Sequence, residues 1–213
     1  MPNLPISQLP DISTSSAGRL IPTGEFAVAQ DGTTYKVPSS GLNPYPVVYG
    51  LFSQTGTTQN ITGTTEQSMI SGGVGTLTVG ANQFNIGDSF EAQFGGVITN
   101  TNGHDIRFRV KASSVILADS GFITIAANSN AVFNLTLNFT IRATGSTTNA
   151  SIITLGTFQT AKPSNAGLEG FGFDDLNNTT FDTTISNTLD VTAQFDTNGD
   201  TLSVEFFRLM KTY

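Results

Sequence analysis

The chain of 213 residues contains no cysteine and no tryptophan, and it has a single histidine, His104. Without cysteine it can form no disulfide, no thiolate nucleophile and no zinc–thiolate site. Lectins commonly stack sugars on exposed aromatic rings, most often tryptophan, so the lack of tryptophan counts against a lectin-like site. The single histidine leaves one candidate base for a serine or cysteine triad. The sequence therefore shows no evident active site.

Charged residues are also scarce. They make up 12% of the chain, with nine Lys and Arg and a net charge of −7, against roughly 25% in an average domain. The few cations form no basic cluster, which argues against binding of nucleic acid. Residues 1–5 lack the charged and apolar regions of a signal peptide, and no apolar run approaches the roughly 20 residues of a membrane span. We expect a soluble protein without a conventional export signal, membrane insertion or cofactor.

Proline and phenylalanine divide the chain into two parts. Seven of the eight prolines lie at or before Pro46, whereas fifteen of the sixteen phenylalanines lie after it. This shift predicts an extended, proline-rich arm over residues 1–45, which serves assembly or attachment, and a body over residues 46–213. Within the arm, two short alternating runs flank Asp31-Gly32, which predicts a β-hairpin. Because an isolated hairpin is marginal in water, we expect it to pack on the body, on another copy or on a partner.

Alternation of apolar and polar residues predicts antiparallel strands in the body. The longest alternation runs over residues 131–143 and places Phe133, Leu135, Leu137, Phe139 and Ile141 on one face. The same pattern occurs over residues 88–94, 104–110, 189–195 and 202–210, with Arg107 and Arg109 facing outward. About eight such strands and no helix predict an all-β fold, an antiparallel β-sandwich that is jelly-roll-like.

Two segments offer a candidate nucleophile or base. His104 follows Asn102-Gly103, a turn pair, and is interpreted as a plain turn residue. Gly87-Asp88-Ser89 resembles the serine block of some lipases, but no Asp-x-x-His follows near the end of the chain. A nucleophile without a base has little claim to catalysis, so we interpret this segment as the start of a strand.

Several carboxylates are candidates for acid–base chemistry or metal binding. Asp174 and Asp175 are adjacent and would point to opposite faces of a strand. A glycosidase pair drawn from Glu91, Asp174, Asp182 and Asp190 would need two carboxyls about 5 to 9 Å apart, which nothing in the sequence favours. The segment Asp196–Asp200 resembles the opening of a calcium loop, but its Gly is fourth rather than sixth. A hairpin turn is favoured there, and a metal stays an open alternative.

Further candidates concern the surface. The four tyrosines are Tyr35, Tyr45, Tyr49 and Tyr213, and most phenylalanines fit inward positions, so neither type forms an obvious binding platform. Glycosylation sequons occur at Asn60, Asn134, Asn138, Asn149, Asn177 and Asn178. Without an export signal we interpret them as by-products of an Asn/Thr-rich surface, with Asn134 and Asn138 on the outer face of a strand.

The stretch over residues 165–181 is rich in glycine and phenylalanine and poor in charge. It predicts an irregular connection with two readings. It either covers one end of the sandwich, or it lies at a contact between subunits, because exposed apolar side chains in a loop need a partner surface.

Several segments resemble a known family. In the arm these are "LPISQLPDIS" and "GRLIPTGEFAVAQDGTTYKV"; in the body they are "GVGTLTVGANQFNIGDSFEAQFGGVI" and "EGFGFDDLNNTTFDTTISNTLDVTAQF". They look like the leaders and heads of virion fibre and decoration proteins from tailed phages and large DNA viruses, including viruses of amoebae. The resemblance implies a jelly-roll-like homotrimer on or in a virus particle, and it carries no catalytic residue.

The sequence therefore predicts a non-enzymatic structural virion protein, fibre-like or capsid-associated. Its expected partners are two further copies of itself and other virion proteins, the latter contacted through the arm. The alternative is an adhesin module that binds a host glycan or receptor through the body. A third reading, a polysaccharide-degrading enzyme, would depend on the body carboxylates. No catalytic, cofactor-binding or metal-binding residue is assigned.

Overall fold

The computed structural model describes residues 25–30, 33–38, 49–56, 58–163 and 167–213, and side chains from residue 50 onward. The chain divides into two units, Met1–Val47 and Val48–Tyr213. In the first unit, β1 (Glu25–Gln30) pairs antiparallel with β2 (Thr33–Pro38), from Gln30 opposite Thr33 to Glu25 opposite Pro38. The predicted hairpin is thus confirmed as a pair of strands, while its turn, Asp31-Gly32, lies outside the described residues, as does Tyr45.

The second unit is built from strands. They are β3 (Tyr49–Gln54), β4 (Gln59–Thr62), β5 (Gln67–Ser68), β6 (Gly73–Gly75), β7 (Thr78–Val79), β8 (Ser89–Asn100), β9 (Asp105–Ala112), β10 (Val115–Asp119), β11 (Ile123–Thr124), β12 (Asn128–Ala143), β13 (Ser151–Ala161), β14 (Leu168–Asn178), β15 (Asn187–Phe195) and β16 (Thr201–Lys211). Among the described residues there is no helix long and apolar enough to cross a membrane.

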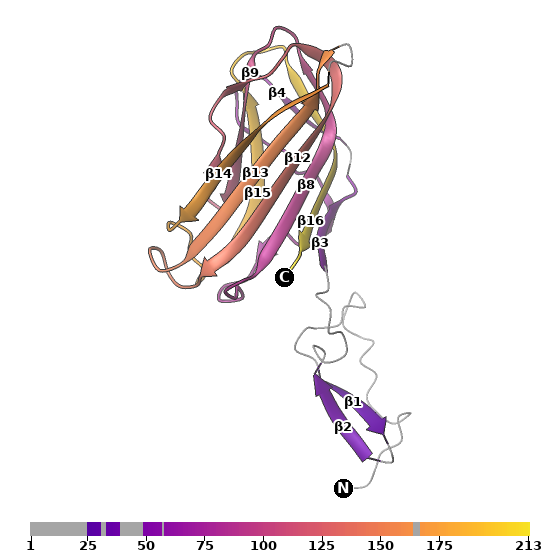
Figure 1. Ribbon diagram of the computed structural model, residues 1–213, viewed down its shortest axis with the longest axis vertical. Coiled ribbons are helices and arrows are strands. Elements are labelled where there is room, and N and C mark those ends of the chain that lie inside the picture. The colour runs from indigo at the N-terminus through magenta and orange to yellow at the C-terminus, as the bar shows by residue number, and fades with distance from the viewer. Residues whose placement is uncertain (1–24, 31–32, 39–48, 57, 164–166) are drawn as a thin grey trace. The chain divides into compact units, whose positions relative to one another are not determined.

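These strands form two facing antiparallel sheets, which confirms the predicted antiparallel β-sandwich. The large sheet has the order β14-β13-β12-β8-β16-β3-β6, with β4 also on β16, and its main strands lie side by side in Figure 1. The small sheet has the order β10-β9-β15-β5, with β11 on β9 and β7 on β15. From β8 onward the chain passes to the small sheet at β9, returns to the large sheet at β12, and crosses again before and after β15. These crossings make the sandwich jelly-roll-like. A meander, β12-β13-β14, widens the large sheet.

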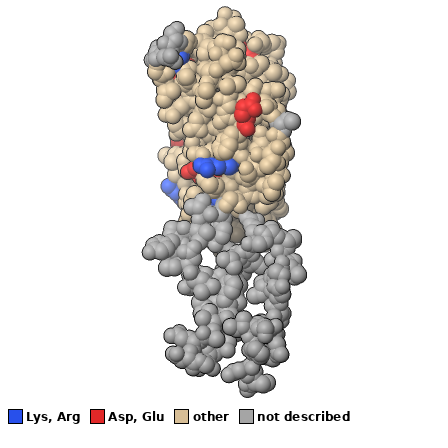
Figure 2. All heavy atoms as spheres, turned by 90° about the vertical axis from the view of Figure 1, so that its right-hand side faces the viewer, with Lys and Arg blue, Asp and Glu red and all other residues tan. Residues whose placement is uncertain are grey.

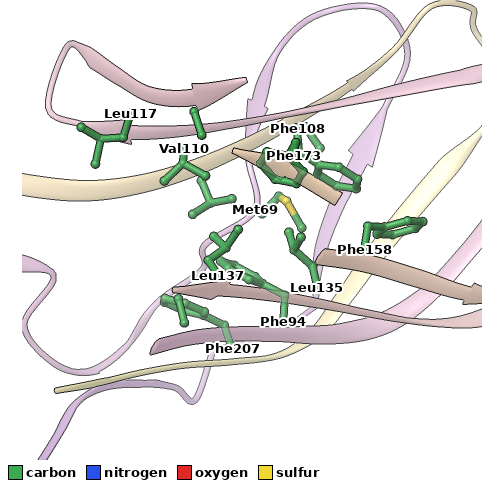
Figure 3. Packing of buried hydrophobic residues seen from close by; sticks show 14 of the residues in the cluster. Met69, Phe94, Phe108, Val110, Leu117, Leu135, Leu137, Phe158, Phe173 and Phe207 are labelled. Atoms are coloured by element: carbon green, nitrogen blue, oxygen red, sulfur yellow. The ribbon is translucent and has the colours of Figure 1, made fainter. Parts of the chain in front are cut away.

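The core fills the space between the sheets and consists largely of the phenylalanines that the alternation pointed inward. Phe94 and Phe207, on adjacent strands of the large sheet, stack with ring centroids 4.3 Å apart. Phe108 of the small sheet meets Phe158 of the large sheet at 5.0 Å. Figure 3 shows these rings with Leu135 and Leu137 between the two layers. The predicted inward residues Phe133, Leu135, Leu137, Phe139 and Ile141 are all buried.

The prediction of an irregular connection over residues 165–181 was wrong. Residues 168–178 form β14, an edge strand paired with β13 from Leu168 opposite Ala161 to Asn178 opposite Ile152. One of the glycines that suggested a loop has a packing reason, since a Cβ at Gly170 would lie 2.2 Å from the carbonyl oxygen of Phe158. Glycine here permits a close approach of two backbones rather than a turn.

The estimate of about eight strands was also too low, because the described part of the body has fourteen, β3 to β16. Several of the additional strands are only two to four residues long: β4, β5, β6, β7 and β11. An alternating pattern cannot be recognised over such a length.

Candidate functional site

The single histidine ties two turns together and is more than the plain turn residue that was predicted. His104 Nδ1 lies 2.7 Å from Asp200 Oδ2. The same carboxylate accepts hydrogen bonds from the backbone N–H and the hydroxyl of Thr101, at 2.8 and 3.1 Å. Burial acts to raise the pKa of Asp200, but these hydrogen bonds from Thr101 and His104 outweigh it and lower the pKa. The pair links the β8–β9 turn to the β15–β16 turn.

The candidate serine lies far from this histidine. Ser89 begins β8 and His104 follows its end, so eleven residues of extended chain, roughly 36 Å, separate them. Ser89 Oγ donates to Gly87 O at 3.0 Å and lies 3.0 Å from Thr140 Oγ1. Asp88 accepts from Lys211 Nζ at 2.6 Å and from Asn85 N at 2.9 Å. These residues secure the start of β8, as the strand interpretation expected.

The carboxylates proposed for acid–base work do not converge. Glu91 and Asp174 lie in one row on the outer face of the large sheet, but β12 and β13 stand between their strands, which separates them by roughly 14 Å. Asp190 lies on the small sheet and accepts a hydrogen bond from Ser68 Oγ at 2.6 Å. Asp182 caps its own loop by accepting from Thr184 N at 2.8 Å.

The Asp196–Asp200 segment is a turn whose acidic side chains are used separately. Asp196 Oδ1 accepts from Asp105 N at 3.1 Å, whereas Asp200 is buried against Thr101 and His104. Over the described parts of the chain, no group of three or more His, Asp or Glu side chains is placed to hold a metal ion.

The outer face of the small sheet carries an ion-pair network. Arg107 and Arg109 point outward, as predicted, and both bind Asp119. Arg109 and Lys111 also bind Glu66. Glu66 Oε1 accepts a further hydrogen bond from the hydroxyl of Thr192 at 2.6 Å. The charged side chains of this face therefore neutralise one another.

The network lowers the pKa of both acids. Burial would raise the pKa of Glu66, but hydrogen bonds from Lys111, Thr192 and Arg109 outweigh it and lower the pKa from 4.5 to about 2. Burial would also raise the pKa of Asp119. Hydrogen bonds from Arg107, Gly121 N and Arg109 outweigh burial and lower this pKa from 3.8 to about 2.

We expect the body to lose stability as the pH falls from about 4.5 to about 2. Both acids have a lower pKa in the folded state than in the unfolded chain, so their contribution is complete above the unfolded pKa and is lost as they are protonated in the fold. Urea unfolding at several pH values, followed by circular dichroism, measures this. Glu66→Gln should lower stability at pH 7 and flatten the profile; an unchanged profile in this variant would contradict the assignment.

The outer face of the large sheet is different, because a group of neutral polar side chains on its central strands β12 and β13 is unpaired. Neighbouring strands place Gln159, Asn134 and Gly95 in one row, and Thr157, Thr136 and Gln93 in the next. Within the part of the chain that the structure describes, the side chains of Gln159, Asn134, Thr157, Thr136 and Asn138 make no hydrogen bond. Asn134 and Asn138 are exposed, as predicted. We call this surface the amide face.

The amide face ends at an exposed aromatic ring. Phe206 lies opposite Gly95 and is 45% exposed. The guanidinium of Arg208 lies 5.8 Å from the centre of the ring and donates from Nε to Gln93 Oε1 at 2.9 Å. Because Gly95 has no side chain, the flank of the ring that faces Asn134 stays open.

A β-bulge presents this ring. The register of β16 against β8 shifts between Val204 and Phe206, so Glu205 and Phe206 both face outward while Phe207 enters the core. A Cβ at Gly96 would lie 1.9 Å from the carbonyl oxygen of Ser203, so the bulge requires glycine there. The sequence analysis assigned phenylalanine to the core and missed Phe206. The signal that was present is the pair Phe206-Phe207, since adjacent residues of a regular strand cannot both face inward.

Charge is sparse around the amide face. Figure 2 shows the side of the sandwich that lies on the right in Figure 1, and its described part likewise carries few charged side chains. Three acids, Glu91, Asp174 and Glu205, share the outer face of the large sheet with two arginines, Arg142 and Arg208. The guanidinium of Arg142 donates to the backbone oxygen of Leu176 at 3.3 Å. The surface therefore has no excess of positive charge with which to attract an anion.

Comparison with known proteins gives distant structural likenesses. No protein-family model matches the chain, and no curated protein matches its sequence. Arcelin-5, a lectin-like defence protein of Phaseolus vulgaris, aligns over 78% of this chain and 92% of its own, with 7% identity and a TM-score of 0.40. Lectin I of Ulex europaeus, solved with the methyl glycoside of α-L-fucose, aligns over 78% and 98%, with 10% identity and a TM-score of 0.36.

A third likeness is to the CBM2 module of the evolved Dit protein of Lactobacillus casei BL23 phage J-1. It covers 78% of this chain and 97% of that module, with 12% identity and a TM-score of 0.32. At TM-scores below 0.5, none of these likenesses bears on the function of this chain.

Proposed function

We propose that the body is a non-enzymatic recognition module whose amide face binds an uncharged glycan. The observation that carries this proposal is the contrast between the two outer faces. On the small sheet, the charged groups pair with one another. On the large sheet, a row of unpaired amides leads to the exposed ring of Phe206, and unpaired hydroxyls lie in the next row.

The chemistry of the amide face fits a sugar. Amide and hydroxyl side chains offer both donors and acceptors, which suits a ligand covered with hydroxyl groups. Phe206 supplies an apolar surface on which the C–H face of a sugar ring can lie. The row from Gln159 to Phe206 crosses four strands and spans roughly 14 Å, so it can contact more than one sugar unit.

The charge of the face selects among glycans. With three acids against two arginines and a chain net charge of −7, sialylated or sulfated sugars gain no electrostatic attraction. A glycan array of neutral and acidic oligosaccharides, probed with the full chain, tests both points. Binding restricted to neutral glycans supports the proposal, and absence of binding to every neutral glycan would overturn it.

A second role, as a homotrimeric structural component of a virus particle, is proposed for the whole chain. The observation that favours it is the two-stranded hairpin β1–β2 in a unit of its own, Met1–Val47. Such a hairpin is marginally stable alone and gains stability when several copies bury it together. In this arrangement the arm assembles the particle component and the body presents the amide face. Multivalent presentation would raise the avidity of weak glycan sites.

We expect removal of residues 1–45 to leave a folded body that no longer assembles. The core that the described side chains form lies between the two sheets of the second unit, so we expect this unit to fold without the arm. Light scattering coupled to size-exclusion chromatography should give a trimer for the full chain and a monomer for residues 46–213, with the same strand signal in circular dichroism. A monomeric full chain would contradict the trimer, and an unfolded truncation would show that the arm is part of the core.

A further inference from the structure

An apolar cavity of about 90 Å³ lies between the two sheets, away from the amide face. The large sheet contributes Phe90, Phe139 and Leu209 to its wall, and the small sheet contributes Ala112 and Leu189. Interiors of folded proteins are packed with few voids larger than a water molecule. An opening of this size between two otherwise well-packed layers is therefore a feature that needs an explanation.

The cavity is closed on one side by residues 76–79, which run from one sheet to the other. Thr76 N donates to Leu51 O of the large sheet at 2.7 Å, and Leu189 N of the small sheet donates to Leu77 O at 2.9 Å. The strand β7 within this segment is only two residues long. We call residues 76–79 the cover. The cover pairs with β15 over only two residues, Thr78 opposite Thr188 and Val79 opposite Asn187. Because this ladder is so short, the cover can open locally without disturbing either sheet.

Two phenylalanines complete the closure beside the cover. Phe84 and Phe181 meet edge to face with ring centroids 5.4 Å apart, and both line the cavity. Phe181 is 1% exposed, whereas Phe84 is only partly buried. The wall on this side is therefore made of aromatic side chains from two loops, which can move apart more easily than strands.

The polar residues around the cavity direct their hydrogen bonds elsewhere. Thr76 Oγ1 donates to Thr78 O at 3.1 Å, and Thr78 Oγ1 lies 2.8 Å from Thr188 Oγ1. Asn187 Nδ2 donates to the backbone oxygens of Asp182 and Ile185, at 2.7 and 3.0 Å. A buried water needs two to four polar partners, and an apolar cavity of this kind stays dry and accepts apolar guests.

We propose that this cavity is a binding site for a small apolar group, an aliphatic molecule or chain end of about three or four carbon atoms. The size follows from the volume, since a water occupies about 30 Å³ in the liquid and a methylene group is of similar size. The cover and the Phe84–Phe181 pair form the entry. The site is independent of the amide face, which lies on the opposite side of the large sheet.

Xenon is the probe for this site, because it is apolar, fits the volume and needs no hydrogen bond. We expect saturable binding of one xenon per full chain, measured by the ¹²⁹Xe chemical shift, and a higher melting temperature under xenon pressure. Ala112→Val adds two methyl groups inside the cavity and should abolish both effects. Ala92→Val adds the same groups at a buried alanine that does not line the cavity, and it should retain them.

Three results would overturn the proposal: no saturable binding to the wild-type chain, equal binding to Ala112→Val, or equal loss in Ala92→Val and Ala112→Val. If Ala112→Val does not fold, Leu117→Ala tests the site by the opposite change in cavity volume. It enlarges the cavity, so xenon should raise its melting temperature more than that of the wild-type chain; an equal or smaller rise would contradict the assignment.

Discussion

Replacing Phe158 by alanine should lower the free energy of unfolding of the body by about 3–5 kcal/mol. The ring of Phe158 is fully buried and contacts Phe108 at 5.0 Å, Phe171 at 5.3 Å and Phe133 at 5.9 Å. It thereby joins β13 of the large sheet to β9 of the small sheet. Its removal leaves a cavity between sheets that cannot close, because the neighbouring rings are held by their own strands.

The same strand supplies the control. Leu155 lies three residues earlier on β13 with its side chain on the outer face, 45% exposed. Leu155→Ala should change stability by less than about 1 kcal/mol. Urea unfolding measures both variants; without tryptophan, far-ultraviolet circular dichroism is the suitable signal. A loss below about 1 kcal/mol for Phe158→Ala would mean that the interior of the sandwich relaxes around the missing ring.

Long alternating segments made the central strands predictable. In β12, every second side chain from Phe133 to Ile141 faces the core, as the alternation predicted. A strand with one buried face tolerates no shift of register, because a shift by one residue would turn its apolar side chains to solvent. The outward direction of Arg107 and Arg109 followed from the same rule. What the sequence could not show was their pairing with Glu66 and Asp119, since Glu66 comes from a distant segment.

The edges of the sheets were harder to predict than the centre. Edge strand β14 contains Gly170 and Gly172, which weaken the strand pattern although the backbone pairs regularly with β13. Short strands such as β7 owe their conformation to the sheets they join rather than to their own residues.

The candidate site was missed for a related reason. Composition places phenylalanine in the core, and the lack of tryptophan counted against a sugar-binding site. A bulge at Glu205-Phe206 turns the ring of Phe206 to the outer face, while the rest of β16 keeps its alternation of inward and outward side chains. The amides were visible as an outward row on β12, but their neighbours on β8 and β13 became known only from the register.

Phe206→Ala should weaken binding of a neutral glycan at least tenfold, which corresponds to about 1.4 kcal/mol. Among the described residues, the ring is the exposed aromatic side chain that adjoins the unpaired amides, and Arg208 and Gln93 hold its surroundings in place. Because the ring is 45% exposed, its removal should cost little stability, about 1 kcal/mol or less. Isothermal titration with the best neutral ligand from the array measures the affinity.

Phe122 is a closely matched control for this experiment. Its ring is 43% exposed and also lies under an arginine, with the guanidinium of Arg107 5.5 Å from its centre, but it belongs to the side of the small sheet. Phe122→Ala should keep the affinity of the wild-type chain. If both variants bind equally well, the glycan site lies elsewhere. If both lose affinity, the effect reflects a general change of the surface. The two rings have nearly the same exposure and each lies beside an arginine, so they differ mainly in the sheet with which they are associated.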